Sequence, residues 1–226
     1  MMVRLMIKVE NLNFRYDDSV VLDDINFELE PGGKYALIGR NGAGKSTLIK
    51  LILNLRKSQA GKITINNISH KSSKWKSEVS YLPEKFAMYP QLTGLENMKF
   101  LGHLSDKKFD EEQAKQVMRD VNLDPESKLP VKAYSKGMTQ RLGLATIIYQ
   151  DSNLIILDEP TSGLDPIGRK DILNIIKGLT DKTILMSSHH FEEVKYTCDH
   201  VLSLEDKKLT LMTTKTFETE YLMEEL

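Results

Sequence analysis

The chain has 226 residues, enough for one or two domains, and 40% of them are apolar, enough to build a buried core. Its 31 basic and 32 acidic residues give a formal net charge of −1, so no chain-wide attraction to nucleic acid is expected. Cys198 is the only cysteine, which excludes an intrachain disulfide and argues against a cysteine-based zinc site. The longest apolar runs are far shorter than the roughly 20 residues that cross a bilayer, so we expect no membrane-spanning segment.

The apolar patterns predict two kinds of β-strand. "INFEL" (25–29) and "KITIN" (62–66) alternate between apolar and polar residues, as half-buried antiparallel strands do. "YALIG" (35–39), "LIILDE" (154–159) and "TILMSS" (183–188) are continuous apolar runs, typical of parallel strands buried on both faces. We therefore predict a parallel sheet together with an antiparallel one.

Apolar residues at helical spacing predict helices between these strands. Between the last two runs, "DPIGRKDILNIIKGLT" predicts a helix and hence a strand–helix–strand unit; its apolar stripe is Ile172, Ile175, Ile176 and Leu179. From Thr93 to about Ile148 the pattern is mostly helical, with one stripe formed by Ala114, Val117, Met118 and Val121. The prediction is a single α/β domain, with its core at 1–84 and 153–226 and a helical insertion at about 85–152.

A glycine-rich loop follows the first buried strand. The stretch "GRNGAGKS" (39–46) fits G-x-x-x-x-G-K-[ST] and precedes a predicted helix, whose apolar stripe is Leu48, Leu51, Ile52 and Leu55. Its glycines let backbone N–H groups point inward toward phosphate, Lys45 would reach the β- and γ-phosphates, and Ser46 would serve Mg²⁺. An ordinary helix-capping turn is disfavoured by the strand and helix on either side. The predicted phosphate site comprises Gly39, Asn41, Gly42, Ala43, Gly44, Lys45, Ser46 and Thr47.

Two adjacent acids at a strand end narrow the chemistry. In "LIILDEP", Asp158 and Glu159 end a buried strand, where one carboxylate can serve Mg²⁺ and its neighbour can polarise an attacking water. A P-loop alone leaves kinases, GTPases and ATPases open. The chain has no N-K-x-D guanine-reading motif, so a GTPase is disfavoured.

The order of further motifs resembles the nucleotide-binding domain of an ABC transporter ATPase. These motifs are "YSKGMTQRLGLA" (134–145), "LDEPTSGLD" (157–165) and "SSHHFEEV" (187–194), and the resemblance extends from Val9 to Leu204. "YLPE" followed by "YPQLTGLENM", and the "SKGM" form of the signature, are similar to exporter-type subunits for drugs, antibiotics or peptides. The resemblance implies a P-loop NTPase core, with an N-terminal antiparallel β subdomain and an inserted α-helical subdomain.

The resemblance also assigns roles to matching residues. Tyr16 would stack on adenine, with Phe14 as the competing aromatic. Glu159 would be the general base and His189 the switch histidine, while Asp165 would link the two subunits or cap the helix after it. The signature loop would contact the γ-phosphate held by the other subunit; its residues are Ser135, Lys136 and Gly137.

The sequence departs from the family pattern at several positions. Lys136 stands where glycine is usual, Tyr134 where leucine is, and Met138 where glutamine is. Glu84, in "YLPEKF", stands where the family usually has a glutamine that approaches Mg²⁺. We expect it to be a metal-linked sensor that places a third acid near Asp158 and Glu159.

The predicted function is an ATPase that binds ATP and Mg²⁺ and closes as a dimer, with itself or a paralogue. It would drive separate transmembrane permease subunits, with export as the expected direction, and lie in the cytoplasm on the inner face of the membrane. The permease is expected to dock near residues 85–94, on Phe86, Met88, Tyr89 and Leu92, unless these side chains only pack the insertion onto the core. The alternatives are a soluble ABC-type switch acting on nucleic acid or ribosomes, which the charge balance disfavours, and a P-loop kinase.

Overall fold

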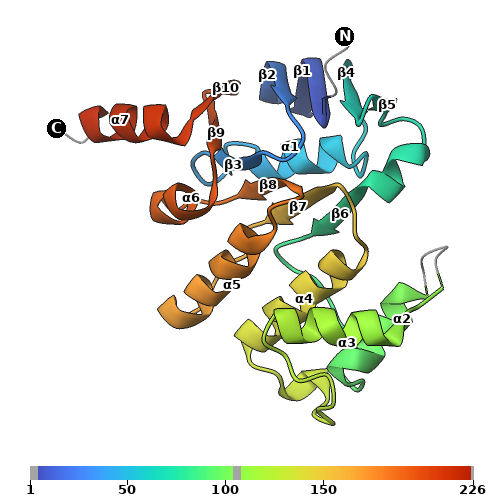
Figure 1. The fold of residues 1–226 in the computed structure, drawn as a ribbon. Helices are drawn as coiled ribbons and strands as arrows, with labels where there is room; N and C mark the ends of the chain where they lie inside the picture. The colour runs from blue at the N-terminus through green and yellow to red at the C-terminus, as the bar shows by residue number, and fades with distance from the viewer. Residues whose placement is uncertain (1–4, 104–107, 225–226) are drawn as a thin grey trace.

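The computed structural model describes residues 5–103 and 108–224, and for 221–224 only the backbone. Two β-sheets lie one above the other, and helices cover the remaining faces (Figure 1). Within the described residues, no helix is long and apolar enough to cross a bilayer.

The first sheet is antiparallel, with strand order β2–β1–β4–β5. Along β1 and β2, apolar side chains alternate inward with exposed polar ones, as the sequence predicts for one buried face. Asp17 has a φ of 46° in the turn between them, a conformation that aspartate tolerates. The strands are β1 (Ile7–Tyr16), β2 (Ser19–Leu29), β4 (Ala60–Ile65) and β5 (Ile68–Ser69).

The second sheet has the order β10–β9–β3–β8–β7–β6. The five strands from β9 to β6 run parallel, and β10 joins β9 as an antiparallel edge. β7 and β8 are fully buried, in agreement with their continuous apolar runs. The strands are β3 (Lys34–Ile38), β6 (Val79–Leu82), β7 (Leu154–Asp158), β8 (Thr183–Ser187), β9 (His200–Glu205) and β10 (Lys208–Thr213).

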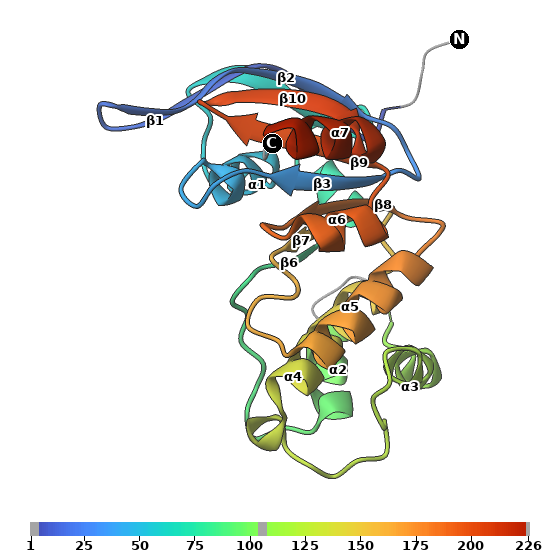
Figure 2. The same ribbon diagram turned by 90° about the vertical axis from the view of Figure 1, so that its left-hand side faces the viewer.

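Three helices of the middle region fall between β6 and β7, inside the segment proposed as an insertion, and lie below the parallel sheet in Figure 2. They are α2 (Gly94–Gly102), α3 (Glu111–Asp120) and α4 (Lys136–Tyr149). The predicted stripe of α3 is buried, and α5 confirms the strand–helix–strand unit. The other helices are α1 (Lys45–Ile52), α5 (Pro166–Gly178), α6 (Phe191–Thr197) and α7 (Thr214–Glu224), with short 3₁₀ turns η1 (Lys74–Glu78) and η2 (Val131–Ala133).

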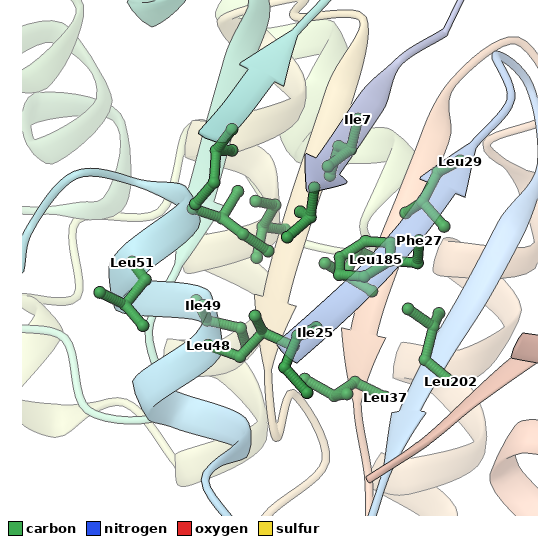
Figure 3. Close-up of a cluster of buried hydrophobic side chains, with 14 of the residues drawn as sticks. Ile7, Ile25, Phe27, Leu29, Leu37, Leu48, Ile49, Leu51, Leu185 and Leu202 are labelled. Atoms are coloured by element: carbon green, nitrogen blue, oxygen red, sulfur yellow. The ribbon is translucent and has the colours of Figure 1, made fainter. Parts of the chain in front are cut away.

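The parallel sheet separates two hydrophobic clusters. The first fills the space between the two sheets and α1, where Ile7, Phe27 and Leu48 meet Leu185 and Leu202 (Figure 3). The second joins the other face of the parallel sheet to α2–α6 without a break. The helical region therefore shares its core with the sheet that carries the phosphate loop.

Two details differ from the sequence prediction. Leu55 was expected on the buried stripe of α1, and this is wrong: the helix ends at Ile52 and Leu55 is 65% exposed. Asn54, with a φ of 51°, turns the chain away from the helix axis and carries Leu55 into solvent. The β9–β10 hairpin was not predicted; its two-residue turn consists of Asp206 and Lys207, both with positive φ and neither of them glycine.

Candidate functional site

The candidate site lies at the carboxyl edge of the parallel sheet. The glycine-rich loop follows β3, Asp158 ends β7, and His189 comes shortly after β8. Because β8 pairs with both β3 and β7, these three segments emerge side by side. Glu84 follows β6, the next strand along, so four separate stretches of sequence converge here.

The backbone of the glycine-rich loop is shaped for an anion. Gly42 and Gly44 have φ values of 84° and 110°, which residues with a Cβ rarely adopt. A Cβ on Gly39 would lie 2.5 Å from the carbonyl oxygen of Leu204. No side chain caps the start of α1 and its first turn holds no acid, so its N–H groups remain available to a ligand.

Lys45 and Asp158 supply a cationic and an acidic side chain to the site. The Lys45 side chain is 8% exposed, and its Nζ donates to the Gly39 oxygen at 2.7 Å. The Asp158 Oδ1 accepts from Ser187 Oγ at 2.7 Å and lies 3.5 Å from Ser46 Oγ. Burial, and then the charge of Asp158, raises the pKa of Tyr81 to about 12, so that phenol stays protonated beside the carboxylate.

Asp158 and Ser46 present the hard oxygen atoms that Mg²⁺ prefers when it also binds a nucleotide phosphate. Ser46 is exposed on the pocket wall, so its hydroxyl group is open to a ligand. Within the described residues, no three His, Cys, Asp or Glu side chains are grouped to hold a metal ion. Glu84 lines the same pocket as Glu159, but Glu84, Asp158 and Glu159 do not form such a group.

Glu159 and His189 form a direct pair. Glu159 Oε2 lies 2.8 Å from His189 Nδ1, and because a carboxylate accepts, Nδ1 carries the proton. The other oxygen, Oε1, is 4.0 Å from Lys45 Nζ. Glu159 has a φ of 50°, and Ser187 Oγ holds this strained turn by accepting from its backbone N–H at 2.9 Å. The Glu159 carboxylate is thus held between His189 and Lys45.

Lys45, Ser46, Glu84, Glu159 and His189 line one pocket of about 490 Å³, whereas the buried Asp158 is not among its lining residues. Tyr16 stands at its wall, 38% exposed, with its hydroxyl 3.3 Å from Thr47 Oγ1, whereas Phe14 is 5% exposed within the core. Of the two aromatics, only Tyr16 is placed to meet a ligand. The pocket lining is Tyr16, Val21, Asn41, Gly42, Gly44, Lys45, Ser46, Thr47, Glu84, Glu159, Ser162 and His189.

Gly39 and Ala43 belong to the loop but not to the pocket lining. Val21, Ser162 and Ser187 were missed by the sequence analysis; only the paired serines of "SSHH", at the end of a buried strand, gave a signal.

The signature residues lie outside the pocket of their own chain. Ser135 Oγ caps α4 by accepting from the Met138 N–H at 3.1 Å, and the Lys136 side chain lies against Gly163. Gly137 follows in the first turn of α4, which lies on the opposite side of the parallel sheet from α1 (Figure 2). Asp165 caps α5 by accepting from the Gly168 N–H at 3.2 Å and is exposed. None of these four residues lines the pocket.

Comparison with known proteins agrees with this arrangement. Residues 22–162 match the family model described as ABC transporter. The chain belongs to the ABC transporter family. It is 33% identical over 217 residues to the linearmycin resistance ATP-binding protein LnrL of Bacillus subtilis, covering 93% of this chain and 70% of that protein. It is 34% identical to the lantibiotic transport ATP-binding protein SrtF of Streptococcus pyogenes, covering 91% and 90%.

Solved structures of the ABC family show the same fold. The structure of cbiO1 from Clostridium perfringens superposes with a TM-score of 0.85 at 24% identity, covering 96% of this chain and 92% of that one. The chain is therefore an ABC ATPase, the ATP-binding and ATP-hydrolysing subunit of a transporter. The predicted fold class, a parallel α/β core with an antiparallel sheet, is confirmed.

Proposed function

We propose that this ABC subunit closes head-to-tail with a second nucleotide-binding subunit around two ATP·Mg²⁺ and drives a separate permease in export of an antibiotic-like or peptide cargo. The direction and cargo class are supported by the relatives, whose names refer to linearmycin resistance and lantibiotic transport. The observation that carries the dimer is the separation of motifs: Ser135 lies outside the pocket that Lys45 and Glu159 line.

In this proposal the functional side chains of the site have separate tasks. Lys45 and the loop N–H groups bind the β- and γ-phosphates, and Tyr16 stacks on the adenine ring. Ser46 and Asp158 hold Mg²⁺, which when bound neutralises charge on the phosphate oxygens. Glu159 takes the proton of the attacking water, and the His189 Nδ1–H fixes the orientation of that carboxylate.

The soluble switch on nucleic acid or ribosomes is not favoured, because the relatives above are transport and resistance subunits. In our proposal the chain lies on the cytoplasmic face of the membrane and reaches it through its permease. A kinase would phosphorylate an acceptor instead of releasing phosphate.

We place the permease contact near residues 85–94. Phe86 and Met88 are half-buried against the second hydrophobic cluster, so they pack the segment onto the core. Tyr89 is 46% exposed and contacts Phe100, itself 42% exposed, with ring centroids 4.3 Å apart. The proposed contact therefore centres on the Tyr89–Phe100 pair, where a short amphipathic helix of the permease would pack.

Mixing two inactive variants tests the head-to-tail arrangement. Ser135→Arg disables the signature loop and Glu159→Gln disables the base, so each homodimer should lack turnover. In a mixed dimer one composite site combines the intact Glu159 of one chain with the intact Ser135 of the other. An equal mixture should then recover up to about a quarter of wild-type ATPase activity, because half of the dimers are mixed and each has one intact site. Absence of any recovery, with mixed dimers demonstrated by a tag pull-down, would contradict the proposal.

A further inference from the structure

Glu193, on α6, is a buried acid that none of the roles above uses. Its side chain is 3% exposed, although that of the preceding residue, Glu192, is exposed to solvent. Burying a carboxylate is costly unless hydrogen bonds and a counter-charge offset the lost hydration. Its partners therefore indicate why a glutamate stands at this position.

Two buried hydroxyl groups donate to the same oxygen of Glu193. Thr161 Oγ1 lies 2.8 Å from Oε2, and Ser188 Oγ lies 2.9 Å from it. Both hydroxyl-bearing residues are buried, at 3% and 1% exposure, so neither has water as an alternative acceptor. Ser188 Oγ also accepts from the His190 N–H at 3.1 Å, which extends the network along the backbone.

The two donors come from the two loops that carry the reactive pair. Thr161 is two residues after Glu159, and Ser188 directly precedes His189. Glu193 is thus bonded to both loops, while Glu159 and His189 meet at 2.8 Å. A shift in either hydroxyl contact would move one partner of that pair relative to the other.

Ser187 and Glu193 hold the strand ends at different points. Ser187 Oγ ties β8 to Asp158 and to the Glu159 N–H. Glu193 ties the next residue, Ser188, to Thr161 beyond the turn. The strained turn at Glu159 is therefore held on both sides of its positive φ.

A third contact connects this network to α5. Arg169 Nε lies 3.3 Å from Glu193 Oε1, and Arg169 is 35% exposed, so the charge of the buried acid is partly offset from the solvent side. Arg169 belongs to the first turn of α5, where its backbone N–H donates to the backbone carbonyl oxygen of Asp165 at 2.9 Å. Glu193 therefore contacts the helix that begins at the proposed link between subunits.

We propose that Glu193 is a positioning residue for hydrolysis: its Oε2 fixes the Glu159 loop against the His189 loop, and it acts through Thr161 and Ser188 without touching ATP. This inference rests on the proposed roles of Glu159 and His189. It predicts that removing the acceptor slows turnover without weakening nucleotide binding, because Lys45 and the glycine-rich loop are held by other contacts.

The test compares Glu193→Ala, Glu193→Gln and the neighbouring exposed control Glu192→Ala. A misplacement of about 1 Å at a reacting group can cost about 100-fold, so Glu193→Ala should lower kcat by about 10- to 100-fold. Its ATP dissociation constant should stay within about twofold of wild type. Glutamine keeps one oxygen that can accept both hydroxyls, so Glu193→Gln should recover most of kcat, and Glu192→Ala should match wild type.

Thr161→Val supplies a second variant that keeps the shape of the side chain and removes only the hydroxyl. It should lower kcat in the same direction as Glu193→Ala, with normal ATP binding, and combining the two changes should cost less than the product of the separate effects. Normal kcat in both single variants, or equal loss of ATP binding and turnover, would overturn the inference. Glu159→Gln measured alongside separates the two proposals: if it retains turnover, the assignment of the base fails whatever Glu193 does.

Discussion

Glu84 is an exposed acid of the pocket, at a position where the resemblance to the ABC family implies a glutamine. The side chain is exposed and lines the same pocket as Ser46 and Glu159, at the mouth of the site and not in a cluster with the buried Asp158. A glutamate here has the shape of glutamine and adds a charge. Its expected effect is therefore on the cation and not on the proton transfer.

Replacing Glu84 by glutamine should raise the Mg²⁺ concentration needed for half-maximal ATPase activity. The expected rise is about three- to tenfold, since a contact to a charged oxygen is roughly twice as strong as one to a neutral oxygen. Turnover at saturating Mg²⁺ should stay near wild type. Titrating Mg²⁺ against ATPase rate measures both quantities.

Glu112→Gln, an exposed change on α3, is the matched control for Glu84→Gln and should leave the Mg²⁺ curve unchanged. Superimposable curves for wild type and Glu84→Gln would remove any metal role. A loss of turnover as deep as in Glu159→Gln would instead mean that Glu84 is the base.

Among the secondary-structure elements, the segment before α2 shows how a polar side chain can shape an apolar surface. Asn97 on α2 is fully buried and accepts from the Tyr89 N–H at 2.7 Å. Its amide nitrogen donates to the carbonyl oxygens of Tyr89, Leu92 and Thr93. The irregular chain of 89–93 thus obtains from this side chain several of the hydrogen bonds that a helix or strand would supply, and backbone bonds supply others. The Tyr89–Phe100 pair depends on this support.

Asn97→Ala should lower the free energy of unfolding by about 2–3 kcal/mol, because it removes the acceptor of the Tyr89 N–H and the packed atoms of a fully buried side chain. Urea denaturation followed by circular dichroism measures this change. Gln91→Ala lies on the same segment with an exposed side chain and should stay within about 0.5 kcal/mol of wild type. Equal stability of the two variants would show that Asn97 does not hold the segment.

The permease contact is tested on the same segment. Tyr89→Ala should weaken copurification of the permease and abolish stimulation of ATPase activity by it, while basal ATP binding stays normal. Tyr196→Ala, an aromatic on α6 with similar exposure of 41%, is the control. Unchanged complex formation and unchanged cargo-linked activity in Tyr89→Ala would place the contact elsewhere.

At the scale of the whole molecule, Cys198 reports on the second hydrophobic cluster, which joins the helical region to the sheet. Burial, with a smaller effect of Asp199, raises the pKa of this thiol to about 12. Only the thiolate reacts with alkylating reagents, and a thiol with so high a pKa is almost entirely protonated at pH 8. Access to the sulfur requires opening of the cluster.

Iodoacetamide should therefore label the folded protein slowly, with a rate that rises steeply through the urea transition. Mass spectrometry of the single adduct gives the rate, since no other cysteine competes. A free thiol peptide in the same urea series corrects for the effect of solvent. Labelling of the native protein as fast as of the unfolded chain would show that the second cluster opens freely without global unfolding.

Local pattern predicted much of this ABC fold, and tertiary contacts account for what it missed. Continuous apolar runs identified β3, β7 and β8 because strands buried on both faces have no polar positions. The β9–β10 hairpin escaped because its turn lacks the glycine that normally marks such turns. Leu55 was misplaced because periodicity does not show where a helix ends.

The residues of the candidate site also fall into two groups, those that the local sequence predicts and those that it does not. Lys45 was recognisable from the motif at 39–46, and Asp158 and Glu159 from the adjacent acids at the end of a buried strand, because each short pattern indicates a known chemistry. Ser187 and Glu193 were not, since each acts on residues about 30 positions away in the chain. Only the folded structure brings such partners together.

Because β8 pairs with both β3 and β7, its position relative to them can change only by whole residues of strand register. A slip of one residue in either ladder would displace His189 by about 3.3 Å along the strand and turn neighbouring side chains to the opposite face. No alignment exists between two registers, so small displacements of the strands cannot compensate for an inserted or deleted residue. Adaptation to a new cargo is therefore expected to accumulate in the loops and helices beyond the sheet, where displacement is continuous, while the ladders tolerate almost no insertion or deletion.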